Sequence, residues 1–304
     1  MVKHFLKPAV LFCLLLIPIF ASCSSAPAGN SAASSTGKTL TVVAAEDFWG
    51  SIAAQLGGKH VTVNSIVSSP NVDPHGYEST ANDARSFAQA DYVILNGVGY
   101  DDWGQKLLDA NPSSTRKVFN VGNYLGKKSG DNPHLWYNPA YVEKAADQIT
   151  ANYQALDPGD KAYYTQQRQL FEQALKPYHD AIATIQKQFA GQPIGSSESI
   201  YVYMAQTLHL NLITPAAYLN AENNGTEPPT SAVTQFNQQI SQKKIHVMML
   251  DVQNISNQTR NLALLVKQQH IPIVEITETI RPAGATFQSW QYAQLQALEK
   301  ALAQ

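Results

Sequence analysis

The sequence predicts an α/β protein with two lobes, each a mostly parallel sheet flanked by helices, joined by one long rigid helix. Two observations favour the lobes: short β-rich runs alternate with helical stretches from Leu40 onward, and a second such alternation occupies the C-terminal half. A third observation, a long helical stretch between the two halves, predicts the connection. The chain has 304 residues, which is long enough for roughly two domains.

Residues 1–22 have the pattern of a secretory signal peptide. Met1–Lys7 contains two lysines and no acid, and the apolar run Ala9–Ala21 is shorter than the ~20 residues that span a bilayer. The run ends in Phe20-Ala21-Ser22-Cys23, which resembles a bacterial lipobox, where cleavage precedes the cysteine and its thiol is lipidated. The sequence therefore predicts a lipidated Cys23. The alternative is an ordinary signal peptide with an incidental cysteine.

A flexible tether over residues 23–38 is expected to follow the signal peptide. Ser24–Thr36 consists largely of Ser, Ala and Gly, which are too polar and too small to build a core. A lipid anchor followed by a tether would hold the protein at a membrane surface with its folded part in solvent. We therefore expect an extracytoplasmic, lipid-anchored protein, either at the cell surface or in the periplasm.

Residues 39–157 are predicted to form the N-terminal lobe. Its β-rich runs are short and apolar, whereas apolar residues in the stretches between them recur near the helical period. The predicted strands are Leu40–Ala44, His60–Val67, Tyr92–Asn96 and Lys117–Val121, and the predicted helices are Phe48–Leu56, Ala81–Ala88 and Trp103–Ala110.

Residues 158–190 are predicted to form the linking helix. They belong to a helical region, Pro139–Phe189, that is interrupted at Asp157-Pro158, where aspartate suits a helix cap and proline suits the first turn. One unbroken helix from Pro158 to Phe189 would be ~48 Å long at ~1.5 Å per residue, enough to run along both lobes. Pro177 removes a backbone hydrogen bond, so we expect a kink there.

Residues 191–304 are predicted to form the C-terminal lobe, in which strands again alternate with helices. The predicted strands are Gln192–Gly195, Leu210–Thr214, Ile245–Asp251 and Ile271–Ile276, and the predicted helices are Ile200–Leu208, Ser231–Gln242, Asn257–Gln269 and Thr286–Leu302.

Composition and motifs exclude several classes of function. A net charge of −2 provides no basic field for a phosphate backbone, so we expect no nucleic-acid partner. Cys13 and Cys23 are the only cysteines, which excludes a disulfide framework and a thiolate metal cluster. The sequence contains no G-x-S-x-G, H-E-x-x-H or phosphate-cradling G-x-x-x-x-G-K motif, so no catalytic residue is predicted.

Two histidines follow predicted strands of the first lobe. His75 lies beyond His60–Val67, and His134 lies beyond Lys117–Val121. Each follows a proline, which restricts the backbone on its approach. Ligands of open α/β sheets bind beyond the carboxyl ends of the strands, so the two imidazoles could converge on one point. The alternative is that both are surface loop residues.

Two glutamates hold equivalent places in the second lobe. Glu198 lies between a predicted strand and a predicted helix, and Glu278 lies immediately beyond Ile271–Ile276. A carboxylate at a helix start also has a purely structural explanation, because it favours the positive helix end. That alternative applies to Glu198 more than to Glu278. Asp251, which ends a predicted strand, is a reserve candidate.

Four motifs occur in a fixed order: D-P-H-x-Y-E, N-P-H-x-W-x-x-P, a Ser-Ser-Glu turn and T-E-T-I. Together with the lipobox they resemble the manganese- and zinc-binding lipoproteins of bacterial ABC importers, the cluster A-I solute-binding proteins. The resemblance covers Leu40 to Leu302. It implies a metal site in the cleft between the lobes, with His75, His134, Glu198 and Glu278 as ligands. It also implies a membrane permease with its cytoplasmic ATPase as partners, and a monomeric receptor.

The chemistry of this ligand set is consistent with the resemblance. Two neutral imidazoles and two carboxylates carry a charge of −2, which a divalent cation neutralises. Four protein ligands leave little open position for a reacting water, so the site suits capture and release rather than catalysis. A metal-dependent hydrolase in the same compartment is therefore the weakest alternative. A surface adhesin of the same fold is another.

The identity of the ion, Mn²⁺ or Zn²⁺, stays open at this point. Imidazole suits zinc, carboxylate suits manganese, and zinc binds a given site more tightly than manganese. The sequence departs from the family pattern at Ser79, where a proline is common, and at Glu278, where many members have aspartate. No histidine-rich acidic loop separates His75 from His134, which weakens a zinc-specific interpretation.

Overall fold

The computed structural model contains two parallel four-stranded sheets, one in each half of the chain. It describes residues 39–69, 74–223 and 225–304, all within one compact unit, so the predicted signal peptide, Cys23 and the whole predicted tether lie outside the described residues. The strands of the first sheet are β1 (Leu40–Glu46), β2 (Val61–Val67), β3 (Tyr92–Leu95) and β4 (Lys117–Asn120). Those of the second are β5 (Pro193–Ser196), β6 (Asn211–Leu212), β7 (Val247–Asp251) and β8 (Ile273–Ile276).

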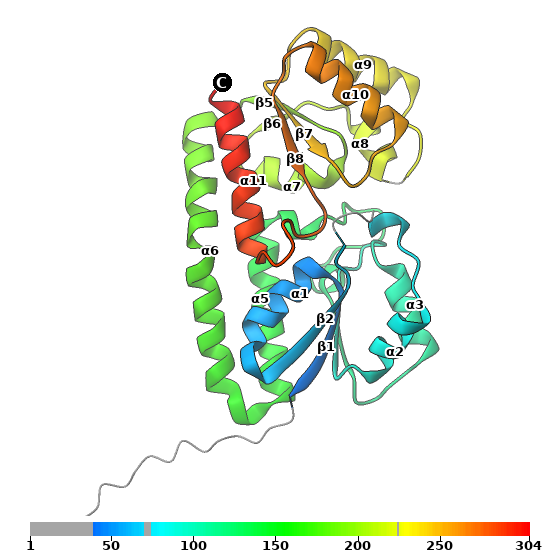
Figure 1. The fold of residues 1–304 in the computed structure, drawn as a ribbon, viewed down its shortest axis with the longest axis vertical. Coiled ribbons are helices and arrows are strands. Elements are labelled where there is room, and N and C mark those ends of the chain that lie inside the picture. Colours follow the sequence, from blue (N-terminus) through cyan, green and yellow to red (C-terminus); the bar gives the residue numbers. More distant parts are fainter. Residues whose placement is uncertain (1–38, 70–73, 224) are drawn as a thin grey trace, which may run out of the picture. The chain divides into compact units, whose positions relative to one another are not determined.

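The two sheets have the same topology. Their strand orders are β2-β1-β3-β4 and β6-β5-β7-β8. In each sheet the second strand of the chain pairs with one side of the first strand, and the third pairs with its other side. At such a switch point the loops after two neighbouring strands diverge and leave a crevice at their carboxyl ends. Figure 1 shows these ends of both sheets directed toward the space between the lobes. The predicted fold class is therefore confirmed, and the topology puts two crevices face to face.

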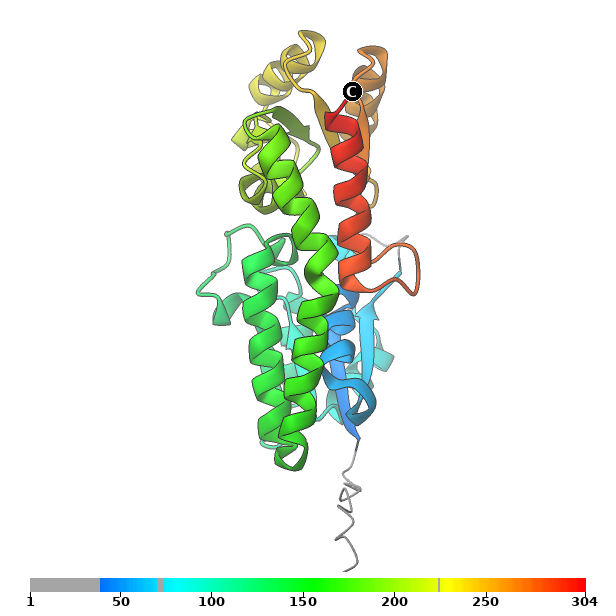
Figure 2. The same cartoon turned by 90° about the vertical axis from the view of Figure 1, so that its left-hand side faces the viewer.

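A single long helix connects the two sheets. Helix α5 (Pro139–Leu156) is followed by a 3₁₀ turn (Pro158–Asp160) and by α6 (Lys161–Phe189), which runs along both lobes (Figures 1 and 2). Helix α6 contains Pro177 without being broken, and Figure 2 shows it bending about halfway along its length. Asp157 occupies the cap position of this 3₁₀ turn and Pro158 lies in its first turn, as predicted, but the Asp157 side chain makes no capping bond and accepts from the Tyr164 hydroxyl at 2.9 Å instead.

The remaining helices flank the sheets, and most begin and end within two residues of the predicted limits. They are α1 (Asp47–Gly57), α2 (Ala81–Gln89), α3 (Asp102–Ala110) and α4 (Val121–Tyr124) in the first lobe, and α7 (Val202–Thr207), α8 (Ala216–Asn223), α9 (Thr230–Ser241), α10 (Asn257–Gln268) and α11 (Phe287–Leu302) in the second. In the described part of the chain, no helix is both long and apolar enough to cross a bilayer.

Two differences from the predicted elements have local causes. Val121 was expected to end a strand but begins α4, because the Asn120 side chain accepts from the Asn123 amide and caps that helix. Helix α8 was not predicted, because its apolar residues do not form a clear stripe at the helical period.

One apolar core extends through both lobes. Trp49 and Trp136 of the first lobe and Tyr201 and Trp290 of the second are at most 2% exposed and belong to the same cluster of contacting side chains. Helix α11 lies beside α6 in both ribbon views (Figures 1 and 2). The site between the two sheets is therefore backed by packed side chains on the α6 side.

Candidate metal centre

The four predicted site residues meet between the two sheets. His75 Nε2 lies 3.2 Å from Glu278 Oε2, and His134 Nε2 lies 3.4 Å from Glu198 Oε1 and 3.7 Å from Glu278 Oε2. Two of these residues come from each lobe. Donor atoms that bind one ion at ~2.0–2.2 Å lie within ~4.4 Å of one another, so these separations fit a shared ion.

His75 lies in a 3₁₀ turn, Pro74–Gly76, that follows the first lobe's edge strand β2. Its ring packs edge-on against Tyr100, with centroids 4.9 Å apart, and against His134 at 5.6 Å. The His75 side chain is 22% exposed, whereas those of the other three residues are 0–3% exposed. Within the group, His75 is thus the residue nearest to solvent.

His134 is fully buried, and its ring orientation is fixed by Asn132. Its Nδ1 lies 2.8 Å from Asn132 Oδ1, and its backbone amide donates to the same oxygen at 3.0 Å. The amide group of Asn132 is oriented in turn by a bond from Nδ2 to the carbonyl of Ser199, at 2.8 Å. With its Nδ1 proton donated to Asn132, His134 directs the Nε2 lone pair at the two glutamates, the tautomer that a metal ligand requires.

Glu198 follows β5 and precedes a 3₁₀ turn, Ser199–Tyr201. It occupies the position of a cap but makes no capping bond with its side chain, so the helix-start explanation does not account for its orientation. Its Oε2 accepts from Asn254 Nδ2 at 3.1 Å, which leaves Oε1 directed at His134. The carboxylate is therefore positioned by a neighbouring loop rather than by its own helix.

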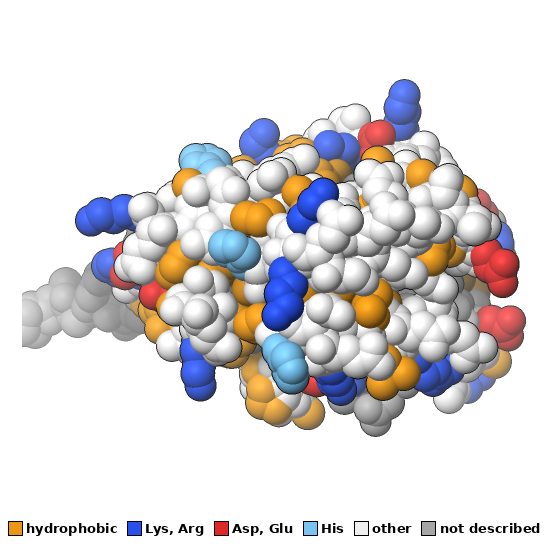
Figure 3. All heavy atoms as spheres, turned by 90° about the horizontal axis from the view of Figure 1, so that it is seen from above, with side chains coloured by type: hydrophobic (Ala, Val, Ile, Leu, Met, Phe, Trp, Pro, Cys, Tyr) orange, Lys and Arg blue, Asp and Glu red, His pale blue; other side chains and the backbone are white. Residues whose placement is uncertain are grey.

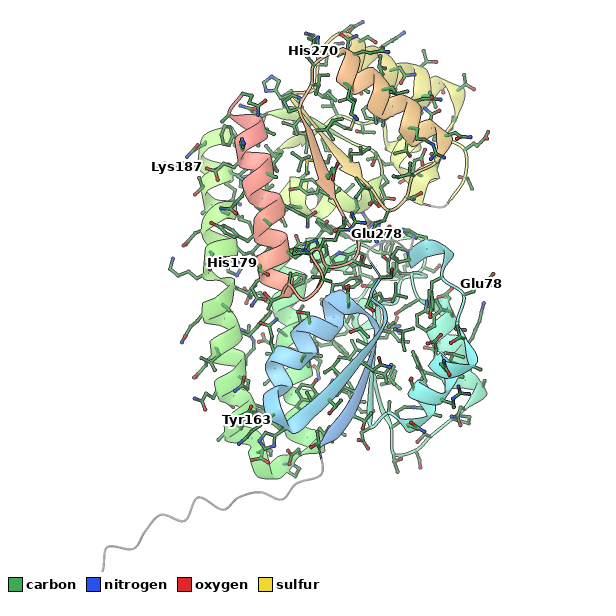
Figure 4. All side chains as sticks on the ribbon, viewed as in Figure 1. Glu78, Tyr163, His179, Lys187, His270 and Glu278 are labelled. Carbon is green, nitrogen blue, oxygen red and sulfur yellow. The ribbon has the colours of Figure 1, made fainter. Side chains whose placement is uncertain are left out.

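Glu278 is held from two sides. The amides of Glu278 and Thr279 donate to Gln253 Oε1 at 2.7 and 3.0 Å, and the Tyr100 hydroxyl donates to Glu278 Oε2 at 2.5 Å. Its Oε1 is buried and accepts no hydrogen bond from the described residues. Figure 4 shows Glu278 at the level between the two lobes, whereas Glu78 of the same sequence motif as His75 lies at the outer surface near α2.

The electrostatics of the site reflect an excess of buried acid. Burial acts to raise the pKa of Glu278, but the adjacent charge of His75 and the contact with His134 outweigh it and hold that pKa well below its usual range. Burial lowers the pKa of His134. Burial and the charges of Glu198 and Glu278 raise the pKa of Asp251 well above its usual range. A bound dication would relieve this crowding of carboxylates.

Further acids lie below the site at the end of β1. Burial, together with the neighbouring Asp101 and Asp47, raises the pKa of Glu46. Asp101 accepts from the amides of Asn96 and Gly97 at 2.6 and 2.8 Å, and burial raises its pKa to about 6. The raised pKa values show that burial and mutual repulsion disfavour the charged form of these carboxyl groups.

A cavity of about 380 Å³ opens beside His75. Tyr100 and Pro133 line it, as do the carboxylates of Asp102 and Asp131. It connects the most exposed of the four residues with the protein surface. The surface-loop alternative is therefore wrong for His134, which is fully buried, whereas the His75 side chain lines this cavity and is 22% exposed.

Other histidines of the described chain lie elsewhere. His60 is near Asp157 and Asp160 at the far end of the first lobe, and His179 pairs with Glu143 on the helices α5 and α6. Figure 4 shows His179 on α6 and His270 at the outer end of the second lobe, both away from Glu278. Seen from above, that end exposes histidine side chains and side chains of lysine or arginine (Figure 3).

Sequence reasoning missed the residues that orient the four. Tyr100, Gln253 and Asn254 lie far from them in sequence, and nothing in the local pattern distinguishes these three from other loop residues. Asn132 could have been found, because it is the first residue of the N-P-H motif and its side chain reaches only two residues ahead.

Comparisons with known proteins agree with one another. A family model described as zinc-uptake complex component A, periplasmic, matches residues 42–301. The metal ABC transporter substrate-binding lipoprotein SloC of Streptococcus mutans is 26% identical over 303 residues, covering 92% of each chain. The manganese ABC transporter substrate-binding lipoprotein PsaA of Streptococcus mitis is 28% identical, covering 72% of this chain and 74% of the relative.

Solved structures share the fold. The periplasmic zinc binding protein TroA from Treponema pallidum superimposes with a TM-score of 0.74 at 17% identity, covering 88% of this chain and all of that one. A Mn-bound mutant of a periplasmic metal binding protein from Candidatus Liberibacter asiaticus gives a TM-score of 0.73 at 18% identity, covering 86% and 99%. Both structures support the arrangement of two lobes and a linking helix.

Proposed function

Since the chain belongs to the family of the periplasmic zinc-uptake complex component A, we propose that it is an extracytoplasmic receptor for one Mn²⁺ or Zn²⁺ ion. The receptor captures the ion between its lobes and delivers it to the permease of an ABC importer, which works with a cytoplasmic ATPase. Relatives named as metal or manganese ABC transporter substrate-binding lipoproteins support this proposal. A metal-binding transport family also argues against the hydrolase alternative, and no observation favours adhesion.

We assign the four ligands to His75, His134, Glu198 and Glu278. The observation that carries the assignment is the convergence of two Nε2 atoms and two carboxylates, from both lobes, within 3.2 to 3.7 Å of their partners. A buried, solvent-poor set of donors with an excess of negative charge fits a divalent cation and no neutral ligand. The ion would balance the carboxylates and link the lobes.

The predicted placement of the chain belongs to the same proposal. Cleavage before Cys23 and lipidation of its thiol would anchor the receptor, residues 23–38 would form the tether, and the folded lobes would reach the permease. The lobes would comprise residues 39–157 and 191–304, linked by residues 158–190, and the receptor would work as a monomer.

Titration of the purified, metal-stripped protein tests this function. We expect the wild-type chain to bind one equivalent of Mn²⁺ or of Zn²⁺, and the double variant His75→Ala, Glu278→Ala to lose at least about 100-fold in affinity for each ion. Isothermal calorimetry gives both stoichiometry and affinity.

A matched control replaces a histidine and a glutamate outside the cleft, His179→Ala with Glu143→Ala. These two residues pair with each other on the helices α5 and α6, at 3.0 Å. Their loss should leave both affinities within about twofold of wild type, a difference near the ~0.4 kcal/mol level. Unchanged binding in the His75/Glu278 variant would reject the assigned site.

A further inference from the structure

Asp251 is a third buried carboxylate beside the two glutamates. It is the last residue of β7, at the switch point of the second sheet, and is fully buried. One of its carboxylate oxygens lies within 4.8 Å of a donor atom on Glu198 and of a donor atom on Glu278. The site therefore contains more acidic oxygens than the four assigned ligands supply.

The two oxygens of Asp251 have different surroundings. Oδ1 accepts from the Gln253 amide at 2.8 Å, which fixes the carboxylate plane. Oδ2 is buried and accepts no hydrogen bond from any residue that the structure describes. A buried acceptor without a donor is unfavourable, so this oxygen is suited to a partner that arrives with the ligand.

No lysine or arginine in the described part of the chain forms an ion pair with Asp251 or Glu278. The nitrogen neighbours of Glu278 are the imidazoles of His75 and His134, at 3.2 and 3.7 Å. An imidazole binds a metal in its neutral form, so neither ring then contributes a positive charge. A dication in the cleft would supply a positive charge beside Asp251.

On the basis of the proposed function, we propose that Asp251 is an additional oxygen donor, through Oδ2, and that it favours Mn²⁺ over Zn²⁺. Zn²⁺ in a filled protein site is almost always tetrahedral, and two histidines with two glutamates already satisfy it. Mn²⁺ prefers a larger, oxygen-rich shell. An extra carboxylate therefore adds more to the affinity for Mn²⁺ than to that for Zn²⁺.

A purely positioning role for Asp251 makes a different prediction. If Asp251 only supports Glu278 by a hydrogen bond, an amide of the same shape can replace it, because the amide nitrogen can donate to that carboxylate. Asp251→Asn is therefore the decisive variant: it keeps the shape of the side chain and can donate a hydrogen bond to Glu278, but it is a weaker, uncharged metal ligand.

The experiment measures Mn²⁺ and Zn²⁺ affinities of metal-stripped wild-type and Asp251→Asn protein by competition with a chelator of known affinity. We expect the dissociation constant for Mn²⁺ to rise at least about tenfold and that for Zn²⁺ less than about threefold. Glu222→Gln is the matched control, because Glu222 is a mostly buried carboxylate of the same lobe outside this cluster, and neither affinity should change.

Electron paramagnetic resonance of bound Mn²⁺ in ¹⁷O-labelled water independently counts the water molecules on the ion. It is measured for wild type, Asp251→Asn and Asp251→Ala. Loss of a protein oxygen should admit one additional water to the manganese shell. Equal losses for both metals, unchanged affinities or an unchanged water count would overturn the role of Asp251 while leaving the proposed function intact. Failure of the wild-type protein to bind either metal would reject both.

Discussion

At the scale of single residues, the charge near the cleft depends on whether individual buried carboxyl groups are protonated. Asp47 is the first residue of α1, in the first lobe. Its Oδ2 accepts from the Ile280 amide at 3.1 Å, and Ile280 lies in the segment of the second lobe that carries Glu278. Its Oδ1 is buried and accepts no hydrogen bond from the described residues. Burial raises the pKa of Asp47 to about 7, although the Ile280 and Phe48 amides oppose that rise. This carboxyl thus titrates near neutral pH, within reach of the site.

The pKa of Asp47 predicts how stability depends on pH. In the unfolded chain the carboxyl has its ordinary pKa of about 3.9, so between about pH 4 and pH 7 the folded protein binds a proton that the unfolded protein releases. Its stabilising contribution is complete below about pH 4 and is lost as pH rises through about 7. At pH 8, Asp47→Asn should therefore be more stable than wild type by at least about 1 kcal/mol. At pH 5 this difference in stability should be smaller.

Urea unfolding of the metal-stripped proteins at several pH values measures this difference. Asp109→Asn is the control, since Asp109 is exposed on α3 and its substitution should not change the pH profile. A stability difference between Asp47→Asn and wild type that stays constant from pH 5 to pH 8 would contradict the prediction.

At the scale of elements, the loop between β7 and α10 fixes both glutamates. Gln253 accepts from the amides of Glu278 and Thr279, and its Nε2 donates to the Thr279 hydroxyl at 2.9 Å. Asn254, the next residue, donates to Glu198. One short loop thus sets the distance between two carboxylates that the chain separates by β6, β7 and β8.

Removal of the Gln253 side chain should loosen that arrangement without removing a ligand. We expect Gln253→Ala to weaken metal binding about tenfold and to speed hydrogen exchange at the Glu278 and Thr279 amides, which lose their acceptor. Calorimetry and amide exchange followed by mass spectrometry measure the two effects. Gln242→Ala, at an exposed position after α9, should change neither, and unchanged exchange in Gln253→Ala would show that this contact is dispensable.

On the scale of the whole folded unit, the lobes are joined by more than the linking helix. Tyr137 donates to the Thr277 carbonyl at 2.8 Å, and Gln55 exchanges hydrogen bonds with Gln288 at 3.1 and 2.7 Å. The continuous core behind the cleft adds apolar contacts to these bonds. A wide hinge motion would break this packing, so release of the ion must involve smaller local shifts.

Spin labels at exposed lysines of the two lobes test this limit. With the native cysteines replaced by serine, labels at Lys106→Cys and Lys267→Cys should report distances that differ by no more than about 2 Å between metal-free and Mn²⁺-loaded protein. A pair within one lobe, Lys243→Cys and Lys267→Cys, controls for label motion. A distance change several times larger would establish a hinge that the shared core does not suggest.

The sequence by itself determined the alternation of strands and helices and the linking helix, and it predicted the four residues that the structure brings together. These features depend on local periodicity, on proline and glycine and on short motifs such as Asn132-Pro133-His134, all of which are read from neighbours in the chain. Asn132 could have been read in the same way, because its partner is only two residues away, but its role was not predicted.

Only the tertiary structure decided how those residues are held. Tyr100 reaches Glu278 across 178 positions of the chain, and Asn254 reaches Glu198 across 56. The place of Asp251 beside both glutamates depends on the order of strands β5, β7 and β8. Such contacts arise from strand order and lobe packing. No local sequence pattern encodes them, because the paired residues are far apart in the chain and the residues next to each of them do not depend on the partner.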